Sequence, residues 1–111
     1  MRKIEWTPDG VDSLNEILGY YIDRAGINTA NTIYDKIIKE IELLKLEEIK
    51  TKRTQELKDI GISDVYELVI KPWKVYYKIS RDNKTVYILF VLDGRRNLEE
   101  ILITKVIEDK I

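Results

Sequence analysis

The side chains best suited to binding or catalysis in this chain of 111 residues are basic, and they are concentrated in one segment. Residues 1–49 carry a net charge of −4, residues 50–96 carry +5 and residues 97–111 carry −2, although the whole chain is at −1. The middle segment indicates either a local basic surface for nucleic acid or ordinary lysines that keep a small protein soluble. Its candidate residues are Lys50, Lys52, Arg53, Lys58, Lys71, Lys74, Lys78, Arg95 and Arg96.

Several kinds of chemistry are excluded by the residue types that the chain lacks. It contains neither Cys nor His, which removes thiol catalysis, His-based triads and the commonest zinc ligands. Its five glycines stand singly and form no phosphate-binding loop. The acidic residues near positions 40–48 lack the spacing of a metal site and are interpreted as a solvated helix end. We therefore expect no metal, no cofactor and no small-molecule substrate.

Arg95 and Arg96 are the strongest candidates for binding a target. They stand directly before Asn97, which with Glu100 three residues later is typical of a capping box that opens a helix. Arginines at a helix N-terminus oppose its partial positive charge. Because local rules tend to be broken at functional sites, this conflict makes a functional role as well supported as the alternative, a pair of ordinary surface charges.

Hydrophobic periodicity predicts the elements that must position these residues. Residues 3–6 alternate as a short strand does, and Thr7-Pro8 then provides the cap and the first position of a helix. Apolar residues at helical spacing predict two helices joined by a short turn into an antiparallel hairpin. The first runs from Pro8 to its end at Ala25-Gly26, and the second is capped by Asn28 and carries apolar residues from Ala30 to Leu44.

The second half of the chain is predicted to be a sheet followed by a helix. Residues 47–61 have no clear period and are interpreted as a polar connector. The β-type runs 65–70, 73–79 and 85–92 predict an antiparallel meander, with the wholly apolar last run in its interior. The final helix is expected to turn inward Leu98, Ile101, Leu102, Val106 and Ile107.

The predicted order β-α-α-β-β-β-α describes an α+β fold, with helices packed on one face of an antiparallel sheet. We expect a single domain over residues 1–111. The longest apolar run, residues 86–92, is far shorter than the ~20 residues that a membrane span needs. Early charges and the lack of Cys favour a cytoplasmic protein without a secretory signal.

With these elements in place, the chain resembles toxins of the RelE/ParE superfamily, from type II toxin–antitoxin systems, over nearly its whole length. Within the superfamily it is most similar to ParE. Members of ParE often have Arg-Glu-Leu in one strand, Pro-Tyr-Arg in the next, and His-Gly-Arg-Arg-Asp where the chain leaves the last strand. Here Tyr66 and Lys74 stand where the family often has Arg, and Asp93 stands where it often has His. The motifs that carry the resemblance are Trp6-Thr7-Pro8, Val65-Tyr66-Glu67-Leu68-Val69-Ile70, Pro72-Trp73-Lys74-Val75-Tyr76-Tyr77-Lys78-Ile79 and Val91-Leu92-Asp93-Gly94-Arg95-Arg96-Asn97-Leu98.

The resemblance implies a toxin that arrests growth, that can serve in plasmid stabilisation, and that a cognate antitoxin neutralises with an acidic helical tail. ParE-like members poison DNA gyrase and are not enzymes, whereas RelE-like members cleave mRNA on the ribosome. The missing C-terminal Tyr or His and the net acidity favour gyrase, with the ribosome and mRNA as the alternative. A binding module without toxicity, on the same fold, is a second alternative.

The resemblance also assigns roles to particular residues. Lys74 and Arg96 match the two strand-borne basic positions of the RelE-type site, and other basic residues are expected nearby. Cleavage of RNA through the 2′-OH also needs proton carriers, for which Tyr66, Tyr76 or Tyr77 is available, and Trp73 can stack an unpaired base. The target-binding set is Arg95, Arg96, Lys74, Lys71, Lys52, Arg53 and Trp73; the catalytic set of the RelE-like alternative is Lys74, Arg96 and Tyr77. An alternating strand must turn one of Tyr76 and Tyr77 into the core.

Overall fold

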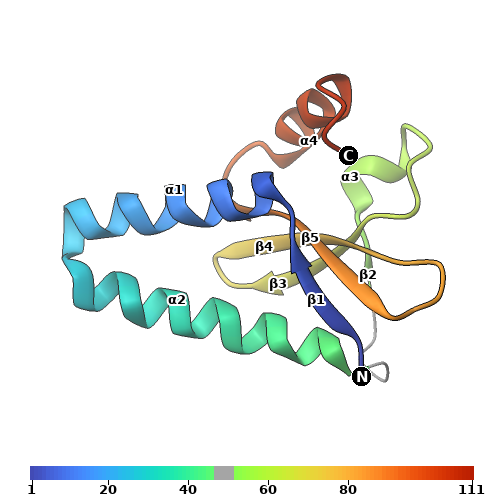
Figure 1. Ribbon diagram of the computed structural model, residues 1–111. Coiled ribbons are helices and arrows are strands. Elements are labelled where there is room, and N and C mark those ends of the chain that lie inside the picture. Colours follow the sequence, from blue (N-terminus) through green and yellow to red (C-terminus); the bar gives the residue numbers. More distant parts are fainter. Residues whose placement is uncertain (47–51) are drawn as a thin grey trace.

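The chain forms a five-stranded mixed sheet with helices on both faces, described here from a computed structural model for residues 1–46 and 52–111 (Figure 1). The predicted α+β class is confirmed. The elements are β1 (Lys3–Trp6), α1 (Pro8–Ala25), α2 (Ile27–Glu42), the 3₁₀ helix η1 (Leu43–Lys45), β2 (Lys52–Arg53), α3 (Gln55–Lys58), β3 (Tyr66–Ile70), β4 (Trp73–Ile79), β5 (Thr85–Asp93) and α4 (Leu98–Ile107).

The stretch predicted as a polar connector, residues 47–61, contains two short elements. Strand β2 and helix α3 both fall within it, and β2 adds to the sheet by pairing with β3. Both elements are too short to give a periodic signal in the sequence. Residues 47–51 of the predicted connector lie outside the described residues.

The strands lie in the order β1-β5-β4-β3-β2, so the apolar strand β5 is in the interior, as predicted. Strands β3, β4 and β5 form the predicted antiparallel meander. The expectation of a wholly antiparallel sheet is wrong, because β1 runs parallel to β5. Parallel neighbouring strands cannot be joined by a tight turn and need a long connection. Here the connection from β1 to β5 begins with the helical hairpin of α1 and α2.

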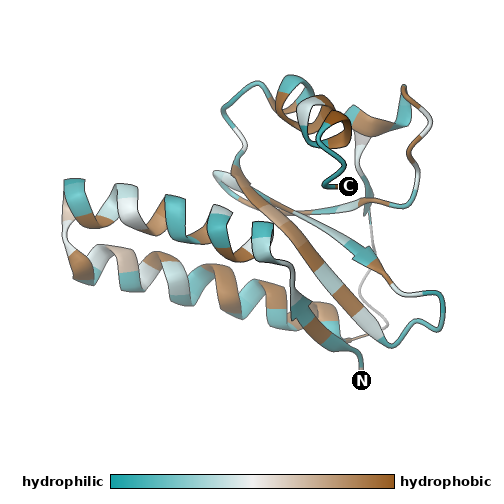
Figure 2. Ribbon diagram, turned by 45° about the horizontal axis from the view of Figure 1, so that its top comes forward, coloured by the Kyte–Doolittle hydropathy of each residue, from teal (hydrophilic) through white to brown (hydrophobic). Residues whose placement is uncertain are grey.

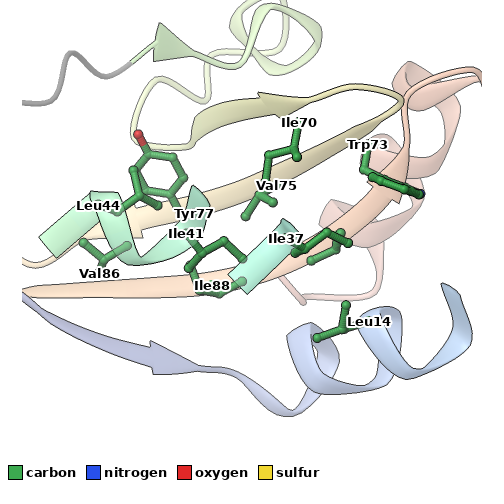
Figure 3. Packing of buried hydrophobic residues seen from close by; sticks show 11 residues of the cluster. Leu14, Ile37, Ile41, Leu44, Ile70, Trp73, Val75, Tyr77, Val86 and Ile88 are labelled. Carbon is green, nitrogen blue, oxygen red and sulfur yellow. The ribbon is translucent and has the colours of Figure 1, made fainter. Parts of the chain in front are cut away.

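The hairpin of α1 and α2 covers one face of the sheet and buries the larger part of the core (Figures 1 and 3). Helix α1 begins as predicted, since the Thr7 hydroxyl accepts a hydrogen bond of 3.0 Å from the Gly10 N–H and Pro8 follows the cap. The buried residues of this cluster are Leu14, Ile37, Ile41, Leu44, Ile70, Trp73, Val75, Tyr77, Val86, Ile88 and Val91.

Helices α3 and α4 cover the opposite face, so the prediction that all helices share one face is wrong. The reason is visible in β5, which is apolar along most of its length and must be covered on both sides (Figure 2). Asn97 caps α4 as predicted, accepting a 3.2 Å hydrogen bond from the Glu100 N–H. This second cluster consists of Leu57, Val65, Tyr76, Leu89, Phe90, Leu92, Leu98 and Leu102.

One of the residues predicted to face inward from α4 does not. Ile107 is 79% exposed, whereas Leu102 is fully buried and Leu98 nearly so. Ile107 lies five residues after Leu102 and therefore about 140° around the helix, on the opposite side. Helix α4 is thus anchored mainly by its first half.

The N-terminus of α1 rests directly on the backbone of β5 at a β-bulge. Tyr76 pairs with Phe90 and Tyr77 with Ile88, so Leu89 is the extra residue. The Thr7 hydroxyl donates a 2.9 Å hydrogen bond to the Ile88 carbonyl, and six residues later the Ser13 hydroxyl accepts one from the Val91 N–H at 2.9 Å. These contacts fix α1 against the sheet and so place its far end.

Replacing Gly10 by alanine is expected to destabilise the fold by about 1–3 kcal/mol, because overpacking at a tight contact forces the backbone apart. A Cβ at this position would lie 2.5 Å from the Ile88 carbonyl oxygen. Urea denaturation followed by circular dichroism measures the change. Gly19→Ala in the same helix is the matched control: a Cβ there has open space, and the helix propensity of alanine should stabilise it by up to about 1 kcal/mol. Equal stabilities of the two variants would contradict this account.

Candidate functional site

A pocket of about 300 Å³ lies between α1 and the end of β5, where the predicted pair Arg95 and Arg96 leaves the sheet. Its apolar wall includes Ile17 of α1 and three aromatic rings. Tyr21 packs edge-on against Trp73, with ring centroids 6.1 Å apart, and Tyr20 packs edge-on against Tyr21 at 5.2 Å. The pocket is therefore aromatic on one side and charged at the other.

Asp93 holds Arg95 in a fixed orientation at the mouth of this pocket. The Arg95 Nε donates to Asp93 Oδ1 at 2.9 Å and its Nη2 donates to Oδ2 at 2.7 Å, which is the bidentate geometry favoured by guanidinium and carboxylate. This pairing lowers the pKa of the Asp93 carboxyl and raises the pKa of Arg95. Arg96 is exposed, and among residues 1–46 and 52–111 no carboxylate forms an ion pair with it. Arg96 is thus the cation at this site that is available to a partner.

Lys74 lies on the other face of the sheet, paired with two carboxylates. Its Nζ is 3.1 Å from Glu67 Oε2 and 3.4 Å from Glu56 Oε1, and Lys52 Nζ lies 3.5 Å from the other oxygen of Glu67. Burial disfavours the charge on Lys74, but the hydrogen bonds and charges of Glu67 and Glu56 outweigh it and raise its pKa. Of the lysines predicted to offer a basic surface, Lys52 and Lys74 are therefore neutralised within the chain.

Of the remaining predicted target-binding residues, Arg53 and Lys71 lie away from the pocket, and Trp73 lines it. Arg53 is exposed with its guanidinium 5.9 Å from the ring centroid of Tyr66. Lys71 is exposed at the turn between β3 and β4. Trp73 is 5% exposed, which leaves no ring face free to stack an unpaired base. The structure thus brings together Arg95, Arg96 and Trp73 at the pocket, and Lys52 and Lys74 around Glu67, but not the whole set.

Tyr77 does not lie with Lys74 in the structure, so the RelE-like catalytic set is not brought together as a whole. Tyr77 is 1% exposed and points into the core under the helical hairpin, where burial raises its pKa to about 12. Lys74 projects from the opposite face of β4, as does Tyr76, which is also buried, in the second cluster. The prediction that one of Tyr76 and Tyr77 faces the core is met by Tyr77, and Tyr76 is buried as well because the opposite face of the sheet is also covered.

Several residues of the pocket and of the ion pairs around Lys74 could not be predicted from the sequence. Glu56 and Glu67 pair with Lys74 across α3 and two strands, and no spacing in the sequence signals such a contact. Tyr20 and Tyr21 belong to the pocket because the last part of α1 packs beside Trp73, the first residue of β4. The pairing of Asp93 with Arg95 is different: the two residues are two positions apart after a strand, and that spacing is a usable signal.

The part of the chain that the structure describes holds no group of three or more Asp or Glu residues placed to bind a metal ion. In the same residues, no helix is both long enough and apolar enough to cross a lipid bilayer.

Comparison with known proteins identifies the family to which this chain belongs. Residues 4–98 match the family described as ParE toxin of type II toxin-antitoxin system, parDE. No curated protein sequence matches the chain. Among solved structures, the chromosomal ParDE system of Pseudomonas aeruginosa aligns with a TM-score of 0.68 and 18% identity, over 84% of this chain and 96% of that chain.

Two further solved structures share the fold. The RelBE2 toxin–antitoxin complex of Mycobacterium tuberculosis aligns with a TM-score of 0.54 and 12% identity, over 83% of this chain and 90% of that chain. The isolated RelE toxin of Escherichia coli aligns with a TM-score of 0.52 and 11% identity, over 96% of this chain and 99% of that chain. The fold is that of the RelE/ParE superfamily. The chain belongs to the ParE toxin family of type II toxin–antitoxin systems.

Proposed function

We propose that this chain arrests growth in the cytoplasm by binding DNA gyrase through protein contacts, and that a cognate antitoxin neutralises it. The observation that carries the proposal is the pairing of Lys74 with Glu67 and Glu56, set against the exposed Arg96 beside an aromatic pocket. The first argues against a phosphate-binding sheet, and the second favours a protein interface.

Binding and cleaving RNA requires uncompensated cations where the phosphate lies. On the sheet face of Lys74 and Lys52, two carboxylates balance two lysines. The tyrosine in the RelE-like set, Tyr77, is enclosed on the opposite side of the sheet. These placements make mRNA cleavage the weaker alternative for this chain.

The pocket has the composition of a site that binds a protein. Tyr, Trp and Arg are the residue types that contribute most to protein interfaces, and here Tyr20, Tyr21, Trp73 and Arg96 lie around one cavity. A partner segment that places an apolar side chain in the pocket and a carboxylate beside Arg96 would use both parts of the site. Arg95 contributes less charge, because Asp93 already pairs with it.

An antitoxin partner is supported by the toxin–antitoxin assemblies that share the fold, the ParDE system and the RelBE2 complex. An acidic tail of such a partner would complement Arg96. Co-expression with the product of the adjacent small reading frame should give a complex that survives gel filtration and restores growth.

Two assays of the purified chain test the proposed target. Inhibition of gyrase supercoiling is expected, and cleavage of codons in the ribosomal A site of a translating extract is not. Lys74→Ala should inhibit gyrase about as well as the wild type, once its folded fraction is measured. Codon-specific cleavage by the purified chain, without an effect on gyrase, would establish the RelE-like alternative instead. Neither activity, together with no growth arrest on expression, would indicate a binding module.

A further inference from the structure

Glu16 of α1 is a charged residue of the pocket that the proposed function does not use. It lies on the helical wall of the pocket, whereas Arg96 lies on the wall that follows β5. Both side chains are exposed. Within residues 1–46 and 52–111, no basic side chain is within ion-pair distance of the Glu16 carboxylate, and this includes Arg95 and Arg96. Two opposite charges therefore line one cavity without neutralising each other.

Tyr20 adds an aromatic ring beside this carboxylate. Residues four positions apart are neighbours on a helix surface, so Glu16 and Tyr20 stand side by side on α1, and both line the pocket. Tyr20 is 51% exposed, and the guanidinium of Arg24 lies 3.8 Å from the centroid of its ring. Lysine and arginine pack their methylene stems on apolar surface while the charged head keeps a polar contact. A basic side chain of a partner can therefore lie along Tyr20 and reach Glu16.

The lining between the two charged walls is apolar. Ile17 of α1, Trp73 of β4 and Val91 of β5 contribute to it. The cavity of about 300 Å³ is at the lower limit of pockets that enclose a small ligand. A protein partner would therefore insert one apolar side chain here, and the residues on either side of that side chain would meet Glu16 and Arg96.

We propose that the pocket recognises a partner segment by two charges of opposite sign on either side of one apolar side chain. A lysine or arginine of the segment pairs with Glu16, and an aspartate or glutamate pairs with Arg96. This rests on the proposed function, because it describes the segment of gyrase that the pocket binds. Glu16 also discriminates between segments, since a wholly acidic segment would bring two carboxylates together at α1.

Substitution of Glu16 tests the proposal, because the sign of the effect depends on the charge of the partner. With a basic side chain opposite Glu16, Glu16→Lys should weaken inhibition of gyrase supercoiling by about tenfold or more, and Glu16→Gln should weaken it by a smaller factor. With a wholly acidic partner segment, both variants should inhibit more strongly than the wild type. Substitutions at exposed positions such as Glu16 leave a protein folded, which circular dichroism checks.

The controls separate a specific contact from a change in net charge. Asp35→Lys makes the same change at an exposed position of α2 that does not line the pocket, and it should inhibit as the wild type does. When Glu16→Gln is combined with Arg96→Ala, the two losses should multiply, because the two side chains hold different groups of the partner.

The inference is overturned if folded Glu16→Lys inhibits gyrase as well as the wild type or better. It is equally overturned if Asp35→Lys weakens inhibition by the same factor. Both results leave gyrase as the target, since the wild type still inhibits it. Failure of the wild type itself to inhibit gyrase would instead overturn the proposed function, and this inference with it.

Discussion

Alanine at both Arg95 and Arg96 is expected to abolish growth arrest while leaving the chain folded. Both side chains are exposed, and they stand beside the positive end of α4, where removal of positive charge costs little. The ion pair lost with Arg95 is a surface pair to Asp93, a class that contributes little to stability. The proposed target, gyrase, would in contrast lose a cationic anchor, and under that proposal we expect its affinity for the chain to fall by tenfold or more.

Growth on induced expression and gyrase supercoiling in vitro measure this effect, and circular dichroism confirms folding. Arg81→Ala is the matched control, because Arg81 is also exposed but lies in the turn before β5, at the opposite end of that strand from the pocket. It should remain toxic. Full toxicity of the double variant at equal expression would show that the pocket is not the target-binding site.

Leu102→Ala is expected to lower the free energy of unfolding by about 2–5 kcal/mol, the range for removing a large buried side chain and leaving a cavity. Leu102 is fully buried between α4 and the second face of the sheet, among Leu57, Phe90 and Leu98. Any loss of toxicity in this variant should follow from unfolding and should be reduced at lower temperature. Urea denaturation measures the free energy directly.

Ile107→Ala is the comparison within the same helix. Ile107 is 79% exposed, so its truncation should change stability by no more than about 0.5 kcal/mol. A cost for Ile107→Ala as large as that for Leu102→Ala would mean that the Ile107 side chain is buried in solution.

Local signals were sufficient for most of the fold. The Thr7 cap, the Asn97–Glu100 capping box and the helical spacing of apolar residues each act over a few positions, and each element they predict is present. What they cannot reveal is which side of the sheet a later helix covers, since that depends on where the chain leaves β5. The parallel pairing of β1 was missed for the same reason, because it joins strands about eighty positions apart.

The candidate site was predictable in part. Arg95 and Arg96 were identified from a local conflict with the helix dipole, and they do line a pocket. The lysines of the sheet were counted as available charges because their partners, Glu56 and Glu67, approach them only in the folded chain. Charge in a sequence is a sum, whereas charge at a site depends on which side chains meet. That the net charge around Lys74 is close to zero could be learned only from the structure.

The contact of Thr7 with Ile88, across 81 positions of sequence, bears on the order in which the protein is made. A ribosome releases the helical hairpin long before it has synthesised β5, the strand on which β1 and the start of α1 rest. Contacts of such high sequence separation form late and slow the folding of a domain. A nascent chain therefore cannot complete its fold until its last third has emerged. The pocket does not exist before then, because it needs both α1 and the residues that follow β5.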